Sequence, residues 1–550
     1  MLLKISKCFS YFKRTLVVFF AMSVHFFYAQ NTNISTNRNQ VNQATIYIKN
    51  QKIPEKETQI GFGAVDFLSI KMPKNKGKDE KNMGFTGIHY NLKLNDWSYA
   101  GLGIYGAVTG IRGGFFTLGI NAGIQQKISK NMFVDAGVHL GGGGGASAPD
   151  GGGAFILPHL NLGYNFGYFS TTAGYSYVNF FDKGAIKNHQ FNVAIQIPLS
   201  FETADFKQRE RVFNFDDFEN LKNTSWNTLS NRISLLVHLN NLSVKKGNYK
   251  GKTMRLAGFE LNSYFNKNMF FFVKADGAYH GIKAGYMDVF LGAGYHISMN
   301  KNRTNILAKF GIGAGGGGGV ETKGGFLIYP DISIEQKVLN NMYVSVNKGF
   351  LMSPDAHFSS NTLGFGLKYY LDKDGITPSS AAPEKSFSSA KLKGLEVIIK
   401  QDLYLNASRI VSTNKNKKDL EFDKNMHQIS LQINLFLNKY IYGAGQTSFA
   451  NFGDAGAYAE GIVGLGVQSA RFLNNRTSVF AQVLAGAAGG GGISTGEGLI
   501  VKPSIGINHK LTNKLNARAG FGYVKARGGN LSNPYLNIGL SYRFSFLSVE

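Results

Sequence analysis

The side chains with the clearest capacity for chemistry are lysines, which gather in three short polar segments. Ammonium groups attract phosphate and carboxylate groups, by up to about 1 kcal/mol each near an anionic membrane surface. The simpler interpretation is a solvated loop that reflects composition alone. We predict an anion-binding role for Lys74, Lys76, Lys78, Lys81, Lys245, Lys246, Lys250, Lys252, Lys415, Lys417 and Lys418.

Three glycine runs, at residues 141–145, 315–319 and 489–492, suggest a phosphate-binding loop at first sight. That motif needs Gly-Lys-Ser/Thr opening a helix, and none of the runs has it. The second run continues through Val320, Glu321 and Thr322 toward a strand. We therefore predict flexible strand ends around an outer hairpin loop, with a shared functional loop as the alternative.

The histidines offer no recognisable catalytic or metal-binding set. His159 occupies a position that Asp331 and Ser504 fill in related segments, which favours a space-filling role. His296 and Asp288 share a face of one strand, but eight residues separate them by about 27 Å. No Ser-His-Asp set with a nucleophile turn is evident. We predict no catalytic residue, no metal site and no cofactor.

The N-terminus has the pattern of a secretory signal. Lys4, Lys7, Lys13 and Arg14 precede an apolar stretch that ends near Ala29. We predict a cleaved signal peptide at residues 1–29 and a polar tail at 30–43, with a retained anchor as the alternative. The one cysteine of the chain falls inside this segment, so the mature protein has no disulfide and no thiolate metal site.

The composition excludes several classes of protein. Hydrophobic residues make up 43% of the 550 residues, enough to exclude disorder as the main state. The net charge of +25 indicates an anionic partner. Because the chain is predicted to be exported, an anionic envelope surface fits the role of this partner better than nucleic acid does.

One unit is present three times. Pro158, Pro330 and Pro503 each follow a glycine run and lie 172 and 173 residues apart. A period of this size is that of a whole small domain rather than a solenoid repeat. We place the units at residues 44–201, 232–372 and 394–550, joined by periplasmic linkers at 202–231 and 373–393.

Within each unit, apolar residues alternate with polar ones over about ten residues, the pattern of a strand with one oily face. Short Asn-rich turns alternate with longer loops, such as residues 71–84, 245–252 and 413–424. Such strands and connections are typical of a transmembrane β-barrel, and a soluble sandwich is the rival fold. The last segment resembles the closing strand of Gram-negative outer-membrane barrels, with Phe544 or Phe546 as its terminal aromatic residue.

We predict an all-β fold of three tandem antiparallel barrels, each of about eight strands. The long linkers favour this arrangement over a single barrel of about 24 strands, which needs only short turns between units. Small residues with charges of both signs would fill a narrow lumen. On one strand these inward residues are Asp331, Ser333, Glu335 and Lys337.

These features together predict a non-enzymatic protein of the Gram-negative outer membrane, structural or surface-binding. The expected partners are outer-membrane lipid, including lipopolysaccharide, and the barrel-assembly machinery during insertion. A passive pore is the alternative and a lipid-modifying enzyme the third possibility.

Overall fold

The computed structural model describes the chain from residue 57 almost to its C-terminus. The described residues are 45–46, 57–74, 77–214, 226–227, 233–265, 268–339, 341–371, 389–407, 409–414, 417–421 and 424–549. The predicted signal peptide, the polar tail, half of the first linker and most of the second therefore lie outside them. In the described part, no helix is long and apolar enough to cross a membrane.

Three closed antiparallel barrels of eight strands follow one another along the chain, which confirms the predicted fold. Barrel 1 consists of β2 (Glu57–Ile70), β3 (Met83–Lys93), β4 (Ser98–Thr109), β5 (Phe116–Lys127), β6 (Met132–Gly144), β7 (Phe155–Asn165), β8 (Ser170–Phe180) and β9 (Lys187–Thr203). Barrel 2 consists of β12 (Ile233–Lys246), β13 (Thr253–Tyr264), β14 (Met269–His280), β15 (Met287–Met299), β16 (Thr304–Gly316), β17 (Phe326–Lys337), β18 (Met342–Met352) and β19 (Ser359–Tyr370). Barrel 3 consists of β20 (Ser389–Tyr404), β23 (Met426–Phe436), β24 (Ile441–Phe452), β25 (Ala459–Gln468), β26 (Thr477–Gly489), β27 (Leu499–Lys510), β28 (Leu515–Ala526) and β29 (Ser532–Val549).

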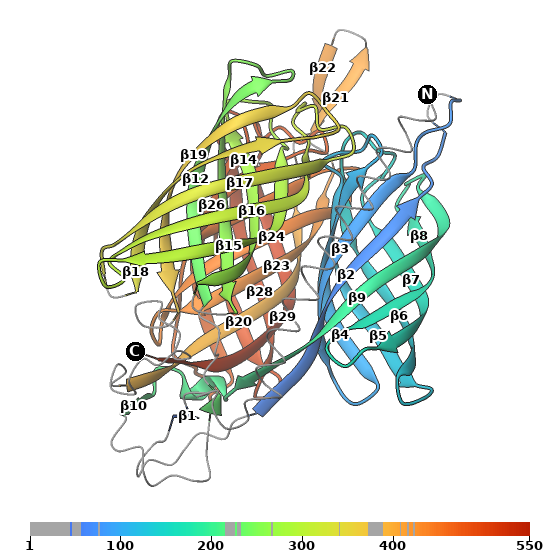
Figure 1. Cartoon of the computed structure of the whole chain (residues 1–550). Helices are drawn as coiled ribbons and strands as arrows, with labels where there is room; N and C mark the ends of the chain where they lie inside the picture. The colour runs from blue at the N-terminus through green and yellow to red at the C-terminus, as the bar shows by residue number, and fades with distance from the viewer. Residues whose placement is uncertain are drawn as a thin grey trace.

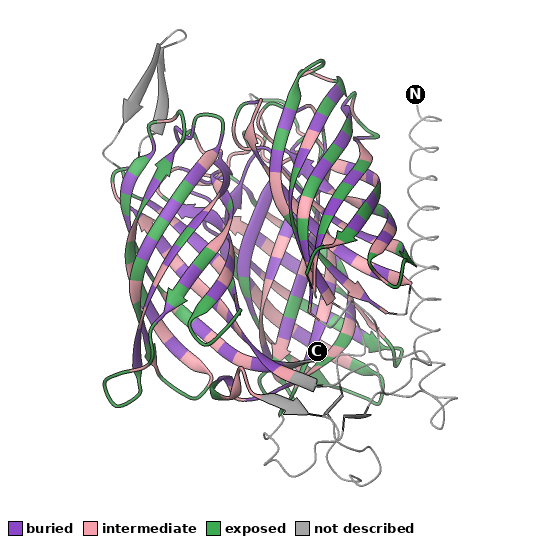
Figure 2. Cartoon of the chain, turned by 90° about the vertical axis from the view of Figure 1, so that its left-hand side faces the viewer, coloured by how far each residue is buried: buried purple, intermediate pink, exposed green. Residues whose placement is uncertain are grey.

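Each strand presents an apolar face outward and a polar face to the barrel interior, so buried and exposed residues alternate along the ribbons (Figure 2). On β29, Leu536 and Ile538 are exposed, whereas Asn537 and Arg543 are buried. A protein dissolved in water has the opposite pattern, with its apolar side chains inside and its polar side chains outside. The pattern observed here is that of a barrel that crosses a lipid bilayer, where the exterior contacts acyl chains and closure leaves no unpaired strand edge.

The three barrels stand side by side with their strands running between the same two ends (Figure 1). β4 of barrel 1 contacts β16 of barrel 2, β14 of barrel 2 contacts β26 of barrel 3, and β24 of barrel 3 contacts β6 of barrel 1. Each contact joins the third strand of one barrel to the fifth strand of the next. Head-to-tail contacts that return to the start after three copies form a ring with pseudo-threefold symmetry.

The glycine runs form the junctions of this ring, a role that the sequence analysis did not anticipate. Gly114, in the β4–β5 loop, lies so close to the second run that a Cβ there would sit 2.4 Å from Gly317 N. A Cβ at Gly489 would sit 2.5 Å from Gly285 N, and one at Gly142, in the first run, would sit 2.6 Å from the Ala450 carbonyl oxygen. Backbone meets backbone at all three junctions, which is the geometric reason for glycine.

An apolar cluster packs between the barrels next to these junctions. Phe116 and Leu118 of barrel 1 meet Ala314 of barrel 2 and Ile429 and Phe449 of barrel 3, all buried. On the faces that contact lipid, such outward residues are exposed. The barrels therefore share a small core outside their own walls, held by close packing rather than by burial from water.

The part of the first linker that is described does more than tether two barrels. After β9, a short 3-10 helix, η1 (Phe206–Gln208), places Phe206 against Phe436 of barrel 3, with ring centroids 5.0 Å apart. The following strand, β10 (Val212–Asn214), pairs with β20. A further pair of short strands, β1 (Thr45–Ile46) and β11 (Trp226–Asn227), lies apart from the barrels. The linker thus covers one mouth of barrel 3.

Candidate functional site: the outer loops and the barrel interiors

The first hairpin loop of each barrel carries the predicted lysines, and all three loops leave the barrels at the same end. The β2–β3, β12–β13 and β20–β23 connections lie at this end, together with the glycine junctions. Short turns, such as β3–β4 and β5–β6, lie at the opposite end, where the linkers also enter. We call the two ends the loop end and the turn end.

In barrel 1 the loop lysines are exposed while the loop itself is anchored. Lys71, Lys74, Lys78 and Lys81 are exposed, and Lys74 lies 3.8 Å from Asp79. The neighbouring Glu80 receives two hydrogen bonds from the Arg112 guanidinium, at 2.7 and 2.5 Å. The same guanidinium donates to the carbonyl oxygens of Ala146 and Ser147, so it ties together three loops. Lys76 lies outside the described residues.

In barrel 2 the lysine loop packs on the barrel's own glycine run. The Tyr249 hydroxyl donates to the Gly318 carbonyl oxygen at 2.7 Å, and Asn248 donates to that of Gly319. The Lys252 ammonium lies over the Tyr249 ring, 5.6 Å from its centroid. All four lysines of the loop are exposed: Lys245, Lys246, Lys250 and Lys252.

In barrel 3 the expected loop contains a protruding hairpin, β21 (Arg409–Asn414) and β22 (Lys417–Glu421). Lys417 and Lys418 belong to β22, their side chains are outside the described part, and Lys415 falls outside it entirely. At the base of the hairpin, Lys424 Nζ lies 3.3 Å from the Asp454 carboxylate. Lys183 of barrel 1 binds the same carboxylate at 3.0 Å, so this ion pair also links two barrels.

One carboxyl group at the loop end stands out electrostatically. Asp150, in the β6–β7 loop of barrel 1, accepts a hydrogen bond from Gly145 N at 2.7 Å and is 8% exposed. Burial disfavours the charged form and raises the pKa of Asp150 to about 7, although the backbone hydrogen bond and Arg112 act in the opposite direction. Asp150 is therefore a group that titrates near neutral pH beside a barrel junction.

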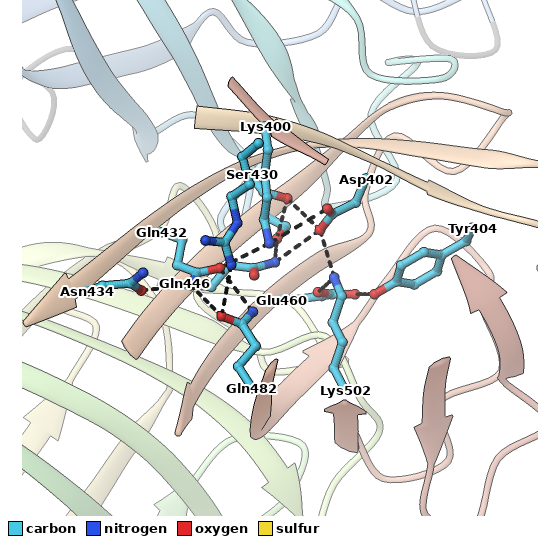
Figure 3. Close-up of polar contacts among 12 residues, drawn as sticks. Lys400, Asp402, Tyr404, Ser430, Gln432, Asn434, Gln446, Glu460, Gln482 and Lys502 are labelled. Atoms are coloured by element: carbon cyan, nitrogen blue, oxygen red, sulfur yellow. Dashed lines mark hydrogen bonds and ion pairs between the residues drawn. The ribbon is translucent and has the colours of Figure 1, made fainter. Parts of the chain in front are cut away.

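Barrels 2 and 3 are filled by buried ion pairs. Lys309 Nζ lies 2.8 Å from Glu260 and 3.0 Å from Asp331 in barrel 2. In barrel 3, Lys502 Nζ lies 2.8 Å from Asp402 and 3.0 Å from Glu460 (Figure 3). A charge is tolerated away from water only when it is paired and hydrogen-bonded, as these are.

Barrel 1 is filled differently, by histidine, aspartate and tyrosine. His89 Nε2 lies 3.0 Å from Asp66, which also accepts a hydrogen bond from the Tyr105 hydroxyl at 2.7 Å. His159 Nε2 lies 3.5 Å from Asp135, which accepts one from Tyr99 at 2.8 Å. Among the described residues, no cluster of three or more His, Cys, Asp or Glu side chains is arranged to hold a metal ion.

The structure places the other singled-out residues as follows. His159, Asp331 and Ser504 all face their own barrel interiors, in hydrogen-bonding environments that differ from barrel to barrel. Asp288 and His296 lie toward opposite ends of β15, and His296 bonds the Tyr264 hydroxyl at 2.7 Å. Asp331, Ser333 and Glu335 are buried as predicted, whereas Lys337 is partly exposed at the end of β17.

The interior ion pairs could not be identified from sequence beyond their inward direction. Lys309 and Glu260 lie 49 residues apart, and Lys502 and Asp402 lie 100 apart. The available signal was a charged residue at an inward position of a strand whose other inward residues are small or polar. That signal predicts which face of the strand the charged side chain occupies, but not which residue of opposite charge it contacts.

No family model matches this chain, and no curated protein matches it. Among solved structures, the siderophore receptor PirA from Pseudomonas aeruginosa is 8% identical, with 90% of this chain and 81% of that one covered and a TM-score of 0.24. OccK11 (OpdR) from Pseudomonas aeruginosa is 9% identical, with 89% and 96% covered and a TM-score of 0.20. The siderophore receptor PirA from Acinetobacter baumannii is 9% identical, with 90% of this chain and 81% of that one covered and a TM-score of 0.26. Scores this low carry no argument about fold or function.

The barrels themselves define the class. The chain is an all-β protein of the outer-membrane β-barrel type, with an apolar exterior and a polar interior in each barrel. Within that class it is a single-chain ring of three small barrels that presents lysine-rich loops at one end.

Proposed function

We propose that this protein is a non-enzymatic, surface-binding component of the Gram-negative outer membrane. In this proposal the loop end faces outward, and its lysines bind the phosphate groups of lipopolysaccharide. An exported precursor is inserted by the barrel-assembly machinery after its signal peptide is removed. The turn end, with its linkers, then faces the periplasm.

The observation that carries the proposal is the equivalence of the three loops. Each is the first hairpin connection of its barrel, and all three lie at one end of a closed ring. The described lysines of the first two loops are exposed, with Asp79 the acid that lies near one of them. Several exposed ammonium groups on one side of a membrane protein give salt-sensitive attraction to an anionic surface.

Binding to lipopolysaccharide vesicles tests the proposal. We expect the folded protein to bind in low salt and to lose most of that binding at 0.5 M salt, where the Debye length falls to about 4 Å from about 30 Å at 0.01 M. Replacing Lys71, Lys74, Lys78 and Lys81 with glutamine should weaken binding about tenfold or more. The matched control replaces exposed cations of the turn end: Lys127, Lys130, Lys301 and Arg303.

Two results would contradict the proposal. One is binding that does not depend on salt. The other is an equal loss in the loop-end and turn-end variants, which would mean that net charge alone controls association.

Solute passage is the second candidate, because barrel 1 contains a polar cavity rather than a continuous set of ion pairs. Single-channel recording in planar bilayers separates the two candidates. Silent insertion, with heat-modifiable gel mobility to show that the barrels are folded, favours the surface-binding function. Large and steady conductance favours passage.

A further inference from the structure

Barrel 1 encloses a cavity of about 40 Å³ in the middle of its lumen. A buried water needs roughly 10–15 Å³ by this measure, so the space suits about three waters or one very small molecule. Its walls come from all eight strands of the barrel. Among the lining residues are Asp66, Asp135, Phe62, Tyr99, Tyr105 and Asn192.

The charge of the cavity wall is one-sided. Among the described residues, Asp66 and Asp135 line the cavity and no lysine or arginine does. In barrel 2, Lys309 neutralises two acids, and its counterpart in barrel 1 is Gly137, which carries no charge. The remaining titratable groups that line the cavity are Tyr99, Tyr105 and three histidines, namely His89, His139 and His159. Asp66 lies 3.0 Å from His89 and Asp135 lies 3.5 Å from His159, so a histidine rather than a lysine or arginine stands beside each carboxylate.

Several polar atoms of the cavity wall are buried and lack a hydrogen-bond partner among the described residues. They are the side-chain oxygens of Asn161, Asn192 and Thr172 and the Nε2 atom of His139. Each of these residues is at most 6% exposed, so bulk water does not satisfy them. The set is richer in acceptors than in donors, which favours a ligand that donates hydrogen bonds.

The two ends of the cavity differ. Toward the loop end, an apolar plug that includes Phe85, Phe115, Phe155 and Phe180 closes the lumen. Toward the turn end, the boundary is made of amides: Gln125 donates to Gln196 at 2.9 Å, and Gln196 donates to Asp135 at 2.7 Å. Amide side chains can part and re-form hydrogen bonds with water far more easily than packed aromatic rings can separate. A ligand would therefore enter from the turn end.

We propose that this cavity binds a small organic cation, a primary ammonium ion of the size of methylammonium. Its three N–H groups would donate to carboxylate and amide oxygens, and its charge would balance Asp66 and Asp135. Phe62 and Tyr99, which pack edge to face with centroids 5.2 Å apart, line the same space and offer aromatic groups to a cation. The site is independent of the loop lysines and of their proposed role.

Isothermal titration calorimetry on the folded full chain in detergent micelles tests the site, with methylammonium chloride as the probe. We expect one site per chain, with no comparable binding of methanol or acetate. Asp66→Asn should weaken binding about tenfold or more, and Ala194→Leu, which fills the cavity without changing its charge, should abolish it. Asp96→Asn, in an exposed turn of the same barrel, is the matched control and should bind as the unmodified protein does.

Heat-modifiable gel mobility checks that each variant is folded. If Asp66→Asn does not fold, Ala194→Leu still tests the site. No heat with methylammonium at pH 8 would overturn the proposal, since the cavity would then hold water alone. Equal binding by the unmodified protein and Ala194→Leu would overturn it too, because it would place the ligand elsewhere.

Discussion

Replacing Lys502 with methionine should destabilise barrel 3 severely, although the two side chains have similar length and volume. Lys502 is 1% exposed and neutralises two carboxylates that are equally inaccessible, Asp402 and Glu460. Removing one partner from a buried ion pair typically costs about 3–5 kcal/mol, because the remaining charge stays buried without compensation. Here Glu460 loses its cation, and Asp402 keeps only Lys400, at 3.8 Å, so a cost within that range applies. Such a loss is a large fraction of the stability of an ordinary domain.

The assay is urea-induced unfolding of the protein folded into lipid vesicles, followed by heat-modifiable gel mobility and tryptic digestion of barrel 3. The double variant Lys502→Met and Glu460→Gln should recover much of the loss, because the remaining acid, Asp402, still has Lys400 at 3.8 Å. Lys74→Met, which breaks the exposed pair with Asp79, should have little effect, since exposed pairs contribute about 0–1 kcal/mol. If Lys502→Met unfolds at the same urea concentration as the unmodified protein, the buried network is not what stabilises the barrel.

Two further predictions concern the junctions between barrels. Gly114→Val should lower the urea midpoint of unfolding more than Gly167→Val does. Both glycines have a positive φ, 90° and 95°, but only a Cβ at Gly114 would meet another barrel. Equal effects of the two substitutions would refute a role for the contact between barrels. Asp150→Asn should flatten the pH dependence of stability. Because the folded-state pKa of Asp150 is raised to about 7 from an ordinary value near 3.8, its carboxyl favours the folded state below that ordinary value and loses this contribution as the pH rises through 7. Unfolding midpoints measured from pH 5 to pH 8 should fall for the unmodified protein relative to the variant, and parallel curves would contradict the assignment.

The strands and their number per unit could be read from the sequence because a barrel wall has a strict period of two. The alternation of Leu536, Ile538 and Leu540 with polar residues predicts their strand, even when the neighbouring strands are unknown. The inward direction of Asp331 and Glu335 followed from the same alternation, and the structure buries both. Local pattern was sufficient wherever the environment on each side of the strand was uniform.

The contacts between barrels could not be read in this way. Gly114 and Gly317 are about two hundred residues apart, and nothing near either one indicates that their backbones touch. The glycine runs looked like loose strand ends because a flexible loop and a tight backbone contact both select glycine. The same limit applies to Phe206, whose place over the mouth of barrel 3 depends on the path of a linker.

Closing the ring within a single polypeptide has a consequence for how such a protein can change. In a trimer of identical chains, every substitution appears three times, so a change useful in one subunit must be tolerated in all of them. Here the equivalent interior positions hold His159, Asp331 and Ser504, and each has its own surroundings. Covalent linkage allows a division of labour, in which barrels 2 and 3 keep their ion pairs while barrel 1 is free to keep a cavity.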